Sequence, residues 1–222
     1  MVAETPALPP VLAEGRNWFA IDKPAGLAVH PGPRTPFSLE QLLPAMAPNR
    51  PPPQPAHRLD RDTSGCLLIA RRPSALRRLA AAFAAGEVDK LYWAIVVHPP
   101  AADSGRIDAP LAKISSRENG WRIKPDRAGK PAATKWEVLA RDGGRALVAF
   151  RPETGRTHQI RVHATLLAPG AAILGDPVYG AADPLGMMLH ARALDFPDPD
   201  GGEGRLHVEA PLPARFIAAG FD

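Results

Sequence analysis

Two runs of alternating apolar and polar residues, separated by a glycine-rich turn, constrain the fold of this chain more than any other feature. The runs cover residues 134–140 and 145–151, and Asp142-Gly143-Gly144 lies between them. Alternation with a period of two buries one face of a strand, and the glycines let the chain reverse within a few residues. We therefore predict a β-hairpin, so that at least part of the sheet is antiparallel.

Further patterns predict more strands than helices. Runs of apolar, aromatic and β-branched residues have the length of strands at residues 18–21, 66–70 and 91–97. Ser74 is expected to cap a helix that runs to Ala85 and ends at Gly86. Residues 157–167 are expected to form a second, shorter helix. Strands that outnumber helices, with an antiparallel hairpin among them, indicate an α+β fold.

The length of the chain suits one globular domain or two small lobes. Its 222 residues are 45% hydrophobic, which is enough for a core. Residues 1–15 are rich in proline and alanine and are expected to form a flexible tail, which leaves residues 16–222 for the folded domain. Residues 44–56 hold six prolines, so that we expect an irregular connection there.

Composition disfavours several classes of protein. No apolar run reaches the roughly 18 residues of a membrane span, and the N-terminus MVAETPALPPVLAEG lacks the basic start and apolar stretch of a secretory signal. The single cysteine, Cys66, cannot form an internal disulfide, and a structural zinc site needs more ligands. We therefore expect a cytoplasmic protein without a membrane partner or a bound metal.

Charge is distributed unevenly along the chain. Seven basic residues and two acids lie between Lys113 and Lys135, which gives 7 − 2 = +5, while the whole chain carries +4. The basic residues are Lys113, Arg117, Arg122, Lys124, Arg127, Lys130 and Lys135. Residues 195–222 hold two arginines and six acids, which gives 2 − 6 = −4. This distribution favours a polyanion bound on one side of the protein, although a solvated basic loop fits the same residues.

The densest polar segment is His57-Arg58-Leu59-Asp60-Arg61-Asp62-Thr63-Ser64-Gly65, directly before the apolar run at residues 66–70. So many charged groups beside a buried strand are costly unless they pair with one another or take part in chemistry. Asp60 is therefore a candidate catalytic carboxylate. The alternative is a charged turn in which Asp60 pairs with Arg58 or Arg61.

A second polar cluster covers residues 152–163. Gly155 permits a sharp turn into the predicted helix. His158 and Arg161 are three residues apart, so that they share one face of that helix. A guanidinium there can hold a carboxylate or a phosphate through two hydrogen bonds. A surface helix with ordinary solvated charges is the alternative.

Both clusters resemble motifs of the RluA-type pseudouridine synthases. The first matches the HRLDxxTSG signature at every fixed position, and Thr154 to His163 match the TGRTHQIRVH segment throughout. Other segments are similar to further family motifs, in the order in which the family has them. They are residues 21–31, 90–96, 105–111, 175–180 and 189–191. His98 and Ala164 depart from the residues usual in the family, which puts local packing in doubt and not the chemistry.

The resemblance implies a role for individual residues. Asp60 stands at the nucleophilic aspartate, and Arg161 at the arginine that pairs with it. Tyr92 stands at the tyrosine that lies against the target base and helps to move a proton. Ile160 stands at an apolar position that lines the uracil pocket. The implied fold is a mixed, mostly antiparallel bent β-sheet with flanking helices and loops, and with the active cleft across its middle.

The implied substrate is structured RNA, either tRNA, rRNA or both. Further candidates for contact with the RNA come from both clusters and the basic segment, in which Trp121 is expected to stack on a base. They are His57, Arg58, Thr63, Arg156, His158, Lys113, Arg122 and Lys124. The resemblance is to the compact branch, which lacks the small N-terminal RNA-binding domain, and we expect a monomer.

The chemistry of isomerisation fits these assignments. The bond from the ribose to nitrogen 1 of uracil is broken and remade to carbon 5, which calls for an ionised carboxylate and a base flipped out of its stack. Attack on the ribose, attack on carbon 6 and assistance to elimination are all compatible with Asp60. No step calls for a metal or an organic cofactor. The alternative from another class is a non-catalytic RNA-binding protein on the same scaffold, which binds RNA without turnover.

Overall fold

The structure is a computed structural model that describes residues 7–32, 35, 37–116 and 120–221. The chain forms two compact units, of which the first comprises the chain up to Asp89 together with Ala191–Pro211. The second comprises Lys90–His190 and the chain from Leu212 onward. In these described parts, no helix has the length and apolar character that crossing a membrane requires.

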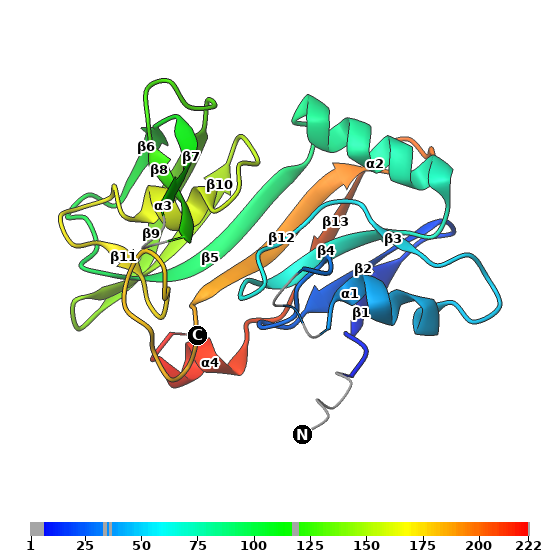
Figure 1. The fold of residues 1–222 in the computed structure, drawn as a ribbon, viewed down its shortest axis with the longest axis horizontal. Helices are drawn as coiled ribbons and strands as arrows, with labels where there is room; N and C mark the ends of the chain where they lie inside the picture. The colour runs from blue at the N-terminus through cyan, green and yellow to red at the C-terminus, as the bar shows by residue number, and fades with distance from the viewer. Residues whose placement is uncertain (1–6, 33–34, 36, 117–119, 222) are drawn as a thin grey trace. The chain divides into compact units, whose positions relative to one another are not determined.

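The first unit is built on a sheet in the order β1-β2-β4-β12, with β3 beside β4 and β13 beside β12 (Figure 1). The β1–β2, β2–β4, β3–β4 and β12–β13 pairs are antiparallel. Its elements are β1 (Val11–Glu14), β2 (Trp18–Lys23), α1 (Leu39–Leu42), a 3₁₀ turn η1 (Leu43–Met46), β3 (Gln54–Pro55), β4 (Ser64–Ala70), α2 (Pro73–Ala85), most of β12 (Leu189–Pro197) and β13 (Arg205–Glu209). The predicted strands at 18–21 and 66–70 are confirmed as β2 and β4.

The core of the first unit forms where α2 packs on this sheet. All seven residues of β4 are buried, which explains why its sequence is continuously apolar rather than alternating. Leu79 and Ala82 of α2 pack against a cluster that includes Leu68 and Phe196. Gly86 ends the helix as predicted, with a left-handed φ of 75°.

Three predictions for the first unit need correction. The helix begins at Pro73 with Arg72 as its N-cap, not at Ser74, because proline is well suited to the first helical position. Val11–Glu14 form β1 on the edge of β2 rather than belonging to the predicted tail. Residues 44–56 are irregular as expected, except where the short elements η1 and β3 fall within them.

The second unit is built on an antiparallel sheet in the order β5-β10-β9-β6, with β11 beside β5 and a separate hairpin of β7 and β8. Its elements are β5 (Asp89–Val97), β6 (Ser104–Asp108), β7 (Leu111–Ser116), β8 (Gly120–Pro125), β9 (Ala133–Asp142), β10 (Arg145–Pro152), α3 (Gln159–Ala164), β11 (Ala172–Ile173) and α4 (Ala214–Ala218). The pairing of Arg145 with Asp142 confirms the predicted hairpin.

The basic segment has more structure than its sequence indicated. Much of the segment between Lys113 and Lys135, for which a solvated loop was one interpretation, is a paired hairpin of β7 and β8, although Arg117 lies outside the described residues. Leu111 and Ile123 of the hairpin are buried against Val162. This apolar anchor explains why a segment rich in charge forms strands.

The second predicted helix is shorter than expected. α3 covers Gln159–Ala164 only, and His158 precedes it as N-cap with a left-handed φ of 55°. His158 therefore does not share a helical face with Arg161, and the sharp turn occurs at His158 rather than at Gly155, which has no positive φ.

The two departures from the family motifs fit the fold. His98 has a positive φ of 49° directly after β5, which is a conformation that glycine adopts without steric cost. Ala164 is fully buried in the core of the second unit. With mostly antiparallel strand pairs and few helices, the chain has the predicted mixed α+β fold with a largely antiparallel sheet.

Candidate active site

Asp60 lies in a turn that leads directly into the buried strand β4. The backbone N–H of Thr63 donates to the carbonyl of Asp60 at 3.1 Å and closes the turn. The Asp60 side chain is half-buried, between buried Leu59 and an exposed Arg61. Arg61 pairs with Asp62 at 3.0 Å, and Arg58 forms no ion pair within the described chain. The ion pair of Arg61 is thus with Asp62 and not with Asp60, which does not favour the charged-turn alternative.

A buried lysine holds this turn in place. Lys23 is fully buried, and its ammonium donates to the carbonyls of Pro24 and Leu27 at 2.8 Å and of Arg61 at 3.0 Å. The N–H of Gly26 also donates to Arg61 at 2.9 Å. A buried ammonium is costly unless its protons are bonded, so these contacts fix the segment after β2 against the Asp60 turn. The sequence signal was a lysine directly before proline at the end of an apolar strand.

Other residues of the first motif have structural contacts. His57 accepts a hydrogen bond from the N–H of Leu68 at 3.0 Å, and its ring lies 4.5 Å from that of Phe83. The Thr63 side chain is buried, while Arg58 is exposed. Gly65 has a φ of 108°, and a Cβ there would lie 2.2 Å from the carbonyl oxygen of Ala191. Glycine is thus required where β4 passes β12.

In the second unit, a buried ion pair orients Arg161. Its guanidinium donates to both carboxylate oxygens of Asp176, at 2.8 Å each, and the two side chains are 5% and 0% exposed. Asp176 also accepts the N–H groups of Val178 and Tyr179. Burial acts to raise the pKa of Asp176, but the hydrogen bonds and charge of Arg161 outweigh it and hold that pKa below its usual value. Sequence reasoning missed Asp176, although residues 175–180 stood among the family motifs.

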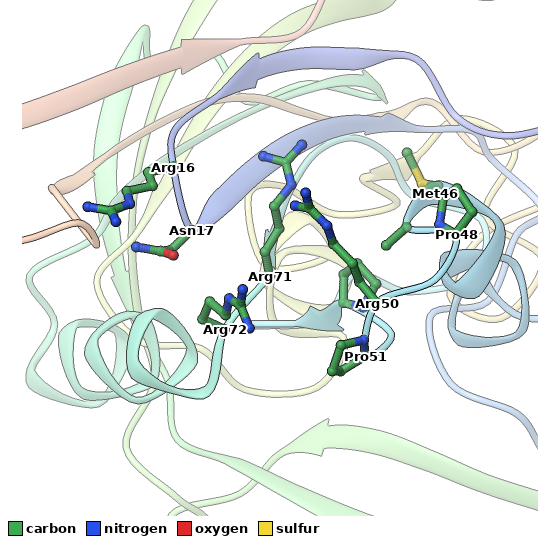
Figure 2. A pocket seen from close by; sticks show the side chains of 10 residues that line it. Arg16, Asn17, Met46, Pro48, Arg50, Pro51, Arg71 and Arg72 are labelled. Carbon is green, nitrogen blue, oxygen red and sulfur yellow. The ribbon is translucent and has the colours of Figure 1, made fainter.

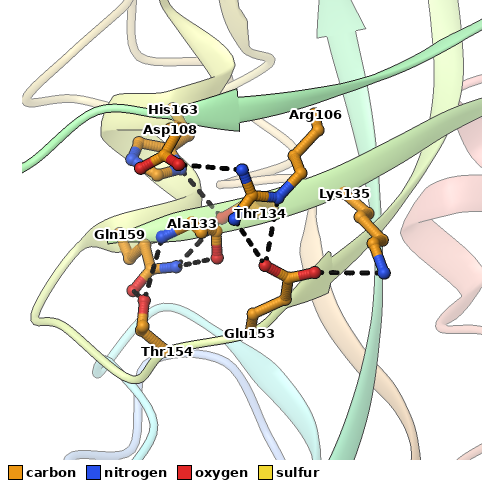
Figure 3. Close-up of polar contacts among 9 residues, drawn as sticks. All are labelled: Arg106, Asp108, Ala133, Thr134, Lys135, Glu153, Thr154, Gln159 and His163. Carbon is orange, nitrogen blue, oxygen red and sulfur yellow. Dashed lines mark hydrogen bonds and ion pairs between the residues drawn. The ribbon is translucent and has the colours of Figure 1, made fainter. Parts of the chain in front are cut away.

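A hydrogen-bonded chain fixes α3 to β9 (Figure 3). The Gln159 amide donates to Ala133 O and to Thr134 Oγ1 at 2.9 Å, and Thr134 Oγ1 lies 2.8 Å from His163 Nδ1. The other nitrogen of His163 faces the carbonyl of Ala109 at 3.1 Å, so it donates there and Nδ1 accepts from Thr134. Burial lowers the pKa of His163, which favours this neutral ring. The buried polar groups of this hydrogen-bonded series are thus paired with one another. They hold α3, which carries Ile160 and Arg161, in a defined orientation.

Part of the basic charge of the second unit is compensated by acidic side chains. Glu153 accepts from Arg106 at 3.0 Å and from Lys135 at 3.1 Å (Figure 3). Lys124 lies 3.6 Å from Asp126. Lys113 and Arg122 form no ion pair with residues that the structure describes. Lys113 and Arg122 therefore leave uncompensated positive charge on the β7–β8 hairpin.

A row of rings connects that hairpin to Arg161. Lys113 lies over the ring of Trp121 at 5.3 Å, and Trp121, which is 48% exposed, lies 5.0 Å from His158. His158 Nδ1 is 2.9 Å from the hydroxyl of Tyr179, which accepts the N–H of Ile123. The Arg161 guanidinium lies over the Tyr179 ring at 5.2 Å. A cationic and aromatic surface of this kind suits phosphates and unstacked bases.

The remaining candidates also lie in the second unit. Tyr92 is half-buried on β5 opposite Phe150 and packs against the core. Ile160 is buried, and Arg156 donates to the carbonyl of Pro131 at 3.0 Å. Asp60 belongs to the first unit, so that its pairing with Arg161 stays a prediction.

Cys66 is a poor candidate for covalent chemistry. Burial, aided by the charge of Asp22, raises the pKa of its thiol to about 12, so the reactive thiolate is absent at neutral pH. Among the described residues, no three side chains of the His, Cys, Asp and Glu types gather where they could hold a metal ion.

Comparison with known proteins connects this arrangement to a family. Residues 17–166 match the family described as RNA pseudouridylate synthase. An uncharacterized RNA pseudouridine synthase of Zymomonas mobilis is 50% identical over 90% of this chain and 92% of its own length. The ribosomal large subunit pseudouridine synthase C of Vibrio cholerae is 36% identical over 94% of this chain and 67% of its own length.

A solved structure agrees with the sequence matches. Human RNA pseudouridylate synthase domain containing 4 is 27% identical and superposes with a TM-score of 0.77, over 93% of this chain and 90% of that one. The chain therefore belongs to the RluA-type family of RNA pseudouridylate synthases, which are isomerases. The resemblance found in the sequence is confirmed.

Proposed function

We propose that the chain converts specific uridines in tRNA, rRNA or both into pseudouridine, with Asp60 as the nucleophile. Tyr92 lies against the flipped base, and Arg161 pairs with the Asp60 carboxylate. The name of the Vibrio cholerae relative, a ribosomal large subunit synthase, supports rRNA among the targets. The family match carries the proposal, because residues 17–166 include Asp60, Tyr92 and Arg161 in one matched segment.

The proposed residues supply what an isomerisation needs. The bond between ribose carbon 1′ and nitrogen 1 breaks, a bond from carbon 1′ to carbon 5 forms, and one hydrogen leaves carbon 5 while nitrogen 1 gains one. Atoms and electrons balance, so no oxidant or second substrate is consumed. Arg161 is already oriented by Asp176, which favours a guanidinium poised to keep a neighbouring carboxylate ionised.

Mapping pseudouridines in a deletion strain tests the function. We expect one or a few positions in tRNA or rRNA to lose the modification, and a plasmid copy of the wild-type gene to restore it. The purified protein should form pseudouridine at the same positions in an unmodified transcript. If no RNA position changes and the purified protein modifies no transcript, the proposal is wrong.

Tyr92→Phe separates the hydroxyl of Tyr92 from its ring. Stacking on the base survives, so RNA affinity should stay within about twofold. Loss of a proton-transferring hydroxyl should lower the single-turnover rate by about 10²–10⁴-fold. Filter binding and single-turnover kinetics measure the two quantities. Weaker binding with a normal rate would instead make Tyr92 a recognition residue.

The β7–β8 hairpin is proposed to contact the phosphates of the RNA. Replacing Lys113, Arg122 and Lys124 with alanine should remove up to three contacts and reduce the log–log salt slope of RNA binding by about 2.1–2.7 in total. The rate at saturating RNA should fall much less, because these residues are not assigned to chemistry. Arg151→Ala, on β10 outside the hairpin, is the control. An unchanged slope in the triple variant would mean that the hairpin is a solvated surface that makes no contact with the RNA phosphates.

A further inference from the structure

The first unit contains a pocket whose only charged lining residues are arginines. Its volume is about 670 Å³, and Arg16, Arg50, Arg71 and Arg72 contribute to its wall (Figure 2). The remaining lining residues are Asn17, Met46, Ala47, Pro48, Pro51 and Pro53. No carboxylate is among them, so that all charged residues of the wall carry the same sign. Such a cavity focuses positive potential and attracts anions.

Acidic groups nearby compensate only part of this charge. Arg71 pairs with Glu14 at 2.6 Å and donates to the carbonyls of Gly15 and Trp18, so it has a structural role. Asp200 is engaged by the backbone N–H groups of Arg16 and Asn17. Four arginines against two carboxylates leave a local charge of 4 − 2 = +2.

Two of these arginines are available to a ligand. The side chains of Arg50 and Arg72 are exposed and form no hydrogen bond or ion pair with any part of the chain that the structure describes. The guanidinium group suits the two-pronged recognition of phosphate. Arg50 lies in the proline-rich connection, in which proline limits the backbone freedom that binding would otherwise cost.

The pocket lies far from Asp60 within the same unit. Asp60 precedes β4, whereas Arg71 and Arg72 directly follow it, so the seven-residue strand separates them by about 20 Å. A phosphate bound in the pocket would therefore belong to a nucleotide remote from the uridine at Asp60.

We propose that this arginine pocket binds a backbone phosphate of the RNA substrate, several nucleotides away from the modified uridine. This inference rests on the proposed function, because a pseudouridine synthase must hold a long polyanion while one base is extruded. Arg50 and Arg72 form the contacts, and Arg71 supports the wall of the pocket. The pocket contributes affinity and register rather than chemistry, since phosphates carry no sequence information.

A salt titration of RNA binding tests the pocket. The protein is the full chain, and the probe is an unmodified tRNA transcript. Arg50→Ala/Arg72→Ala should reduce the log–log slope by about 1.4–1.8. Between 50 and 200 mM salt, the wild type should thus lose about ninefold more affinity than the variant. Under single-turnover conditions, the half-saturating RNA concentration should rise while the maximal rate stays within about twofold.

Arg77→Ala/Arg151→Ala is the matched control. It removes the same charge from two exposed arginines outside the pocket, and its slope should equal that of the wild type. Equal slopes for the pocket variant and the wild type would refute the proposal that the pocket binds an RNA phosphate. Equal reductions of the slope in the pocket variant and the control variant would refute it as well. Wild-type protein that modifies no RNA but shows the predicted slopes would overturn the proposed function and leave the pocket as an RNA-phosphate site.

A second experiment tests whether the pocket binds a small phosphorylated ligand instead of an RNA phosphate. Inorganic phosphate and a nucleoside diphosphate are added separately, and Tm is measured. We expect the same small Tm change in the wild type and in Arg50→Ala/Arg72→Ala. A rise confined to the wild type, together with equal RNA slopes, would show that the pocket serves a free phosphate ligand and that the RNA proposal is wrong.

Discussion

Asp60→Asn is expected to abolish pseudouridine formation, with a rate lowered by more than about a thousandfold. The amide keeps the shape of the side chain but has no charge to attack with or to stabilise a developing cation. The expectation is the same whether Asp60 attacks the ribose, attacks carbon 6 or assists elimination. The turn itself should persist, because the hydrogen bond from the Thr63 N–H to the backbone carbonyl of Asp60 is kept in the variant.

Asp62→Asn is the matched control for this experiment. Asp62 lies two residues away in the same turn and pairs with exposed Arg61, so its loss should leave the rate within about twofold, since exposed ion pairs contribute ~0–1 kcal/mol. The measurements are pseudouridine formation on the mapped transcript and RNA affinity for both variants. Turnover by Asp60→Asn near the wild-type rate would refute the nucleophile.

The second large effect is expected for Asp176→Asn. The substitution leaves the buried Arg161 without the carboxylate that neutralises it in the second unit. Breaking a buried ion pair from one side costs about 3–5 kcal/mol. The free energy of unfolding in urea should fall by this amount, and activity should fall as well because Arg161 loses its orientation.

Asp103→Asn provides the comparison for stability. Asp103 forms a similarly short pair with Arg141 at 2.9 Å, but its side chain is 86% exposed, so the loss should be below about 1 kcal/mol. Equal losses of unfolding free energy for Asp176→Asn and Asp103→Asn would show that the buried pair of Arg161 and Asp176 stabilises the protein no more than an exposed pair does.

Acid provides an independent check of the same pair. The pKa of Asp176 is lower in the folded protein than its usual value near 3.8, so the pair stabilises the protein fully above that value. Its contribution is lost as the pH falls through the lower folded pKa. The stability gap between the wild type and Asp176→Asn should therefore be constant near neutral pH and narrow below about pH 4. A gap that instead widens in acid would contradict the assignment.

Local sequence pattern predicted the elements whose pairing is local. The β9–β10 hairpin followed from its turn, and β4 from its apolar run, because both signals lie within a few residues. The motif match also supplied Asp60, Tyr92 and Arg161 as candidates. The β7–β8 hairpin was missed because its anchor is Val162, about 40 residues further along the chain, and no local pattern reports such a contact.

The supporting residues were harder to predict than the candidates they support. Lys23 contacts Arg61, and Arg161 contacts Asp176, through hydrogen bonds between separate segments. His158 was assigned to a helical face by its spacing from Arg161. Its left-handed φ instead makes it the N-cap, so that the helix begins one residue later, at Gln159. Spacing describes a regular helix only, so it fails where the chain turns into one.

The buried thiol has a practical consequence for studying motion. The chain has one cysteine, and because Cys66 is buried with a pKa near 12, maleimide dyes should react slowly with the native protein. A cysteine introduced at exposed Ser115 on the hairpin would then be the one readily labelled position, without any prior removal of native thiols. A fluorophore there would report on the hairpin alone, in a protein whose core is otherwise unaltered.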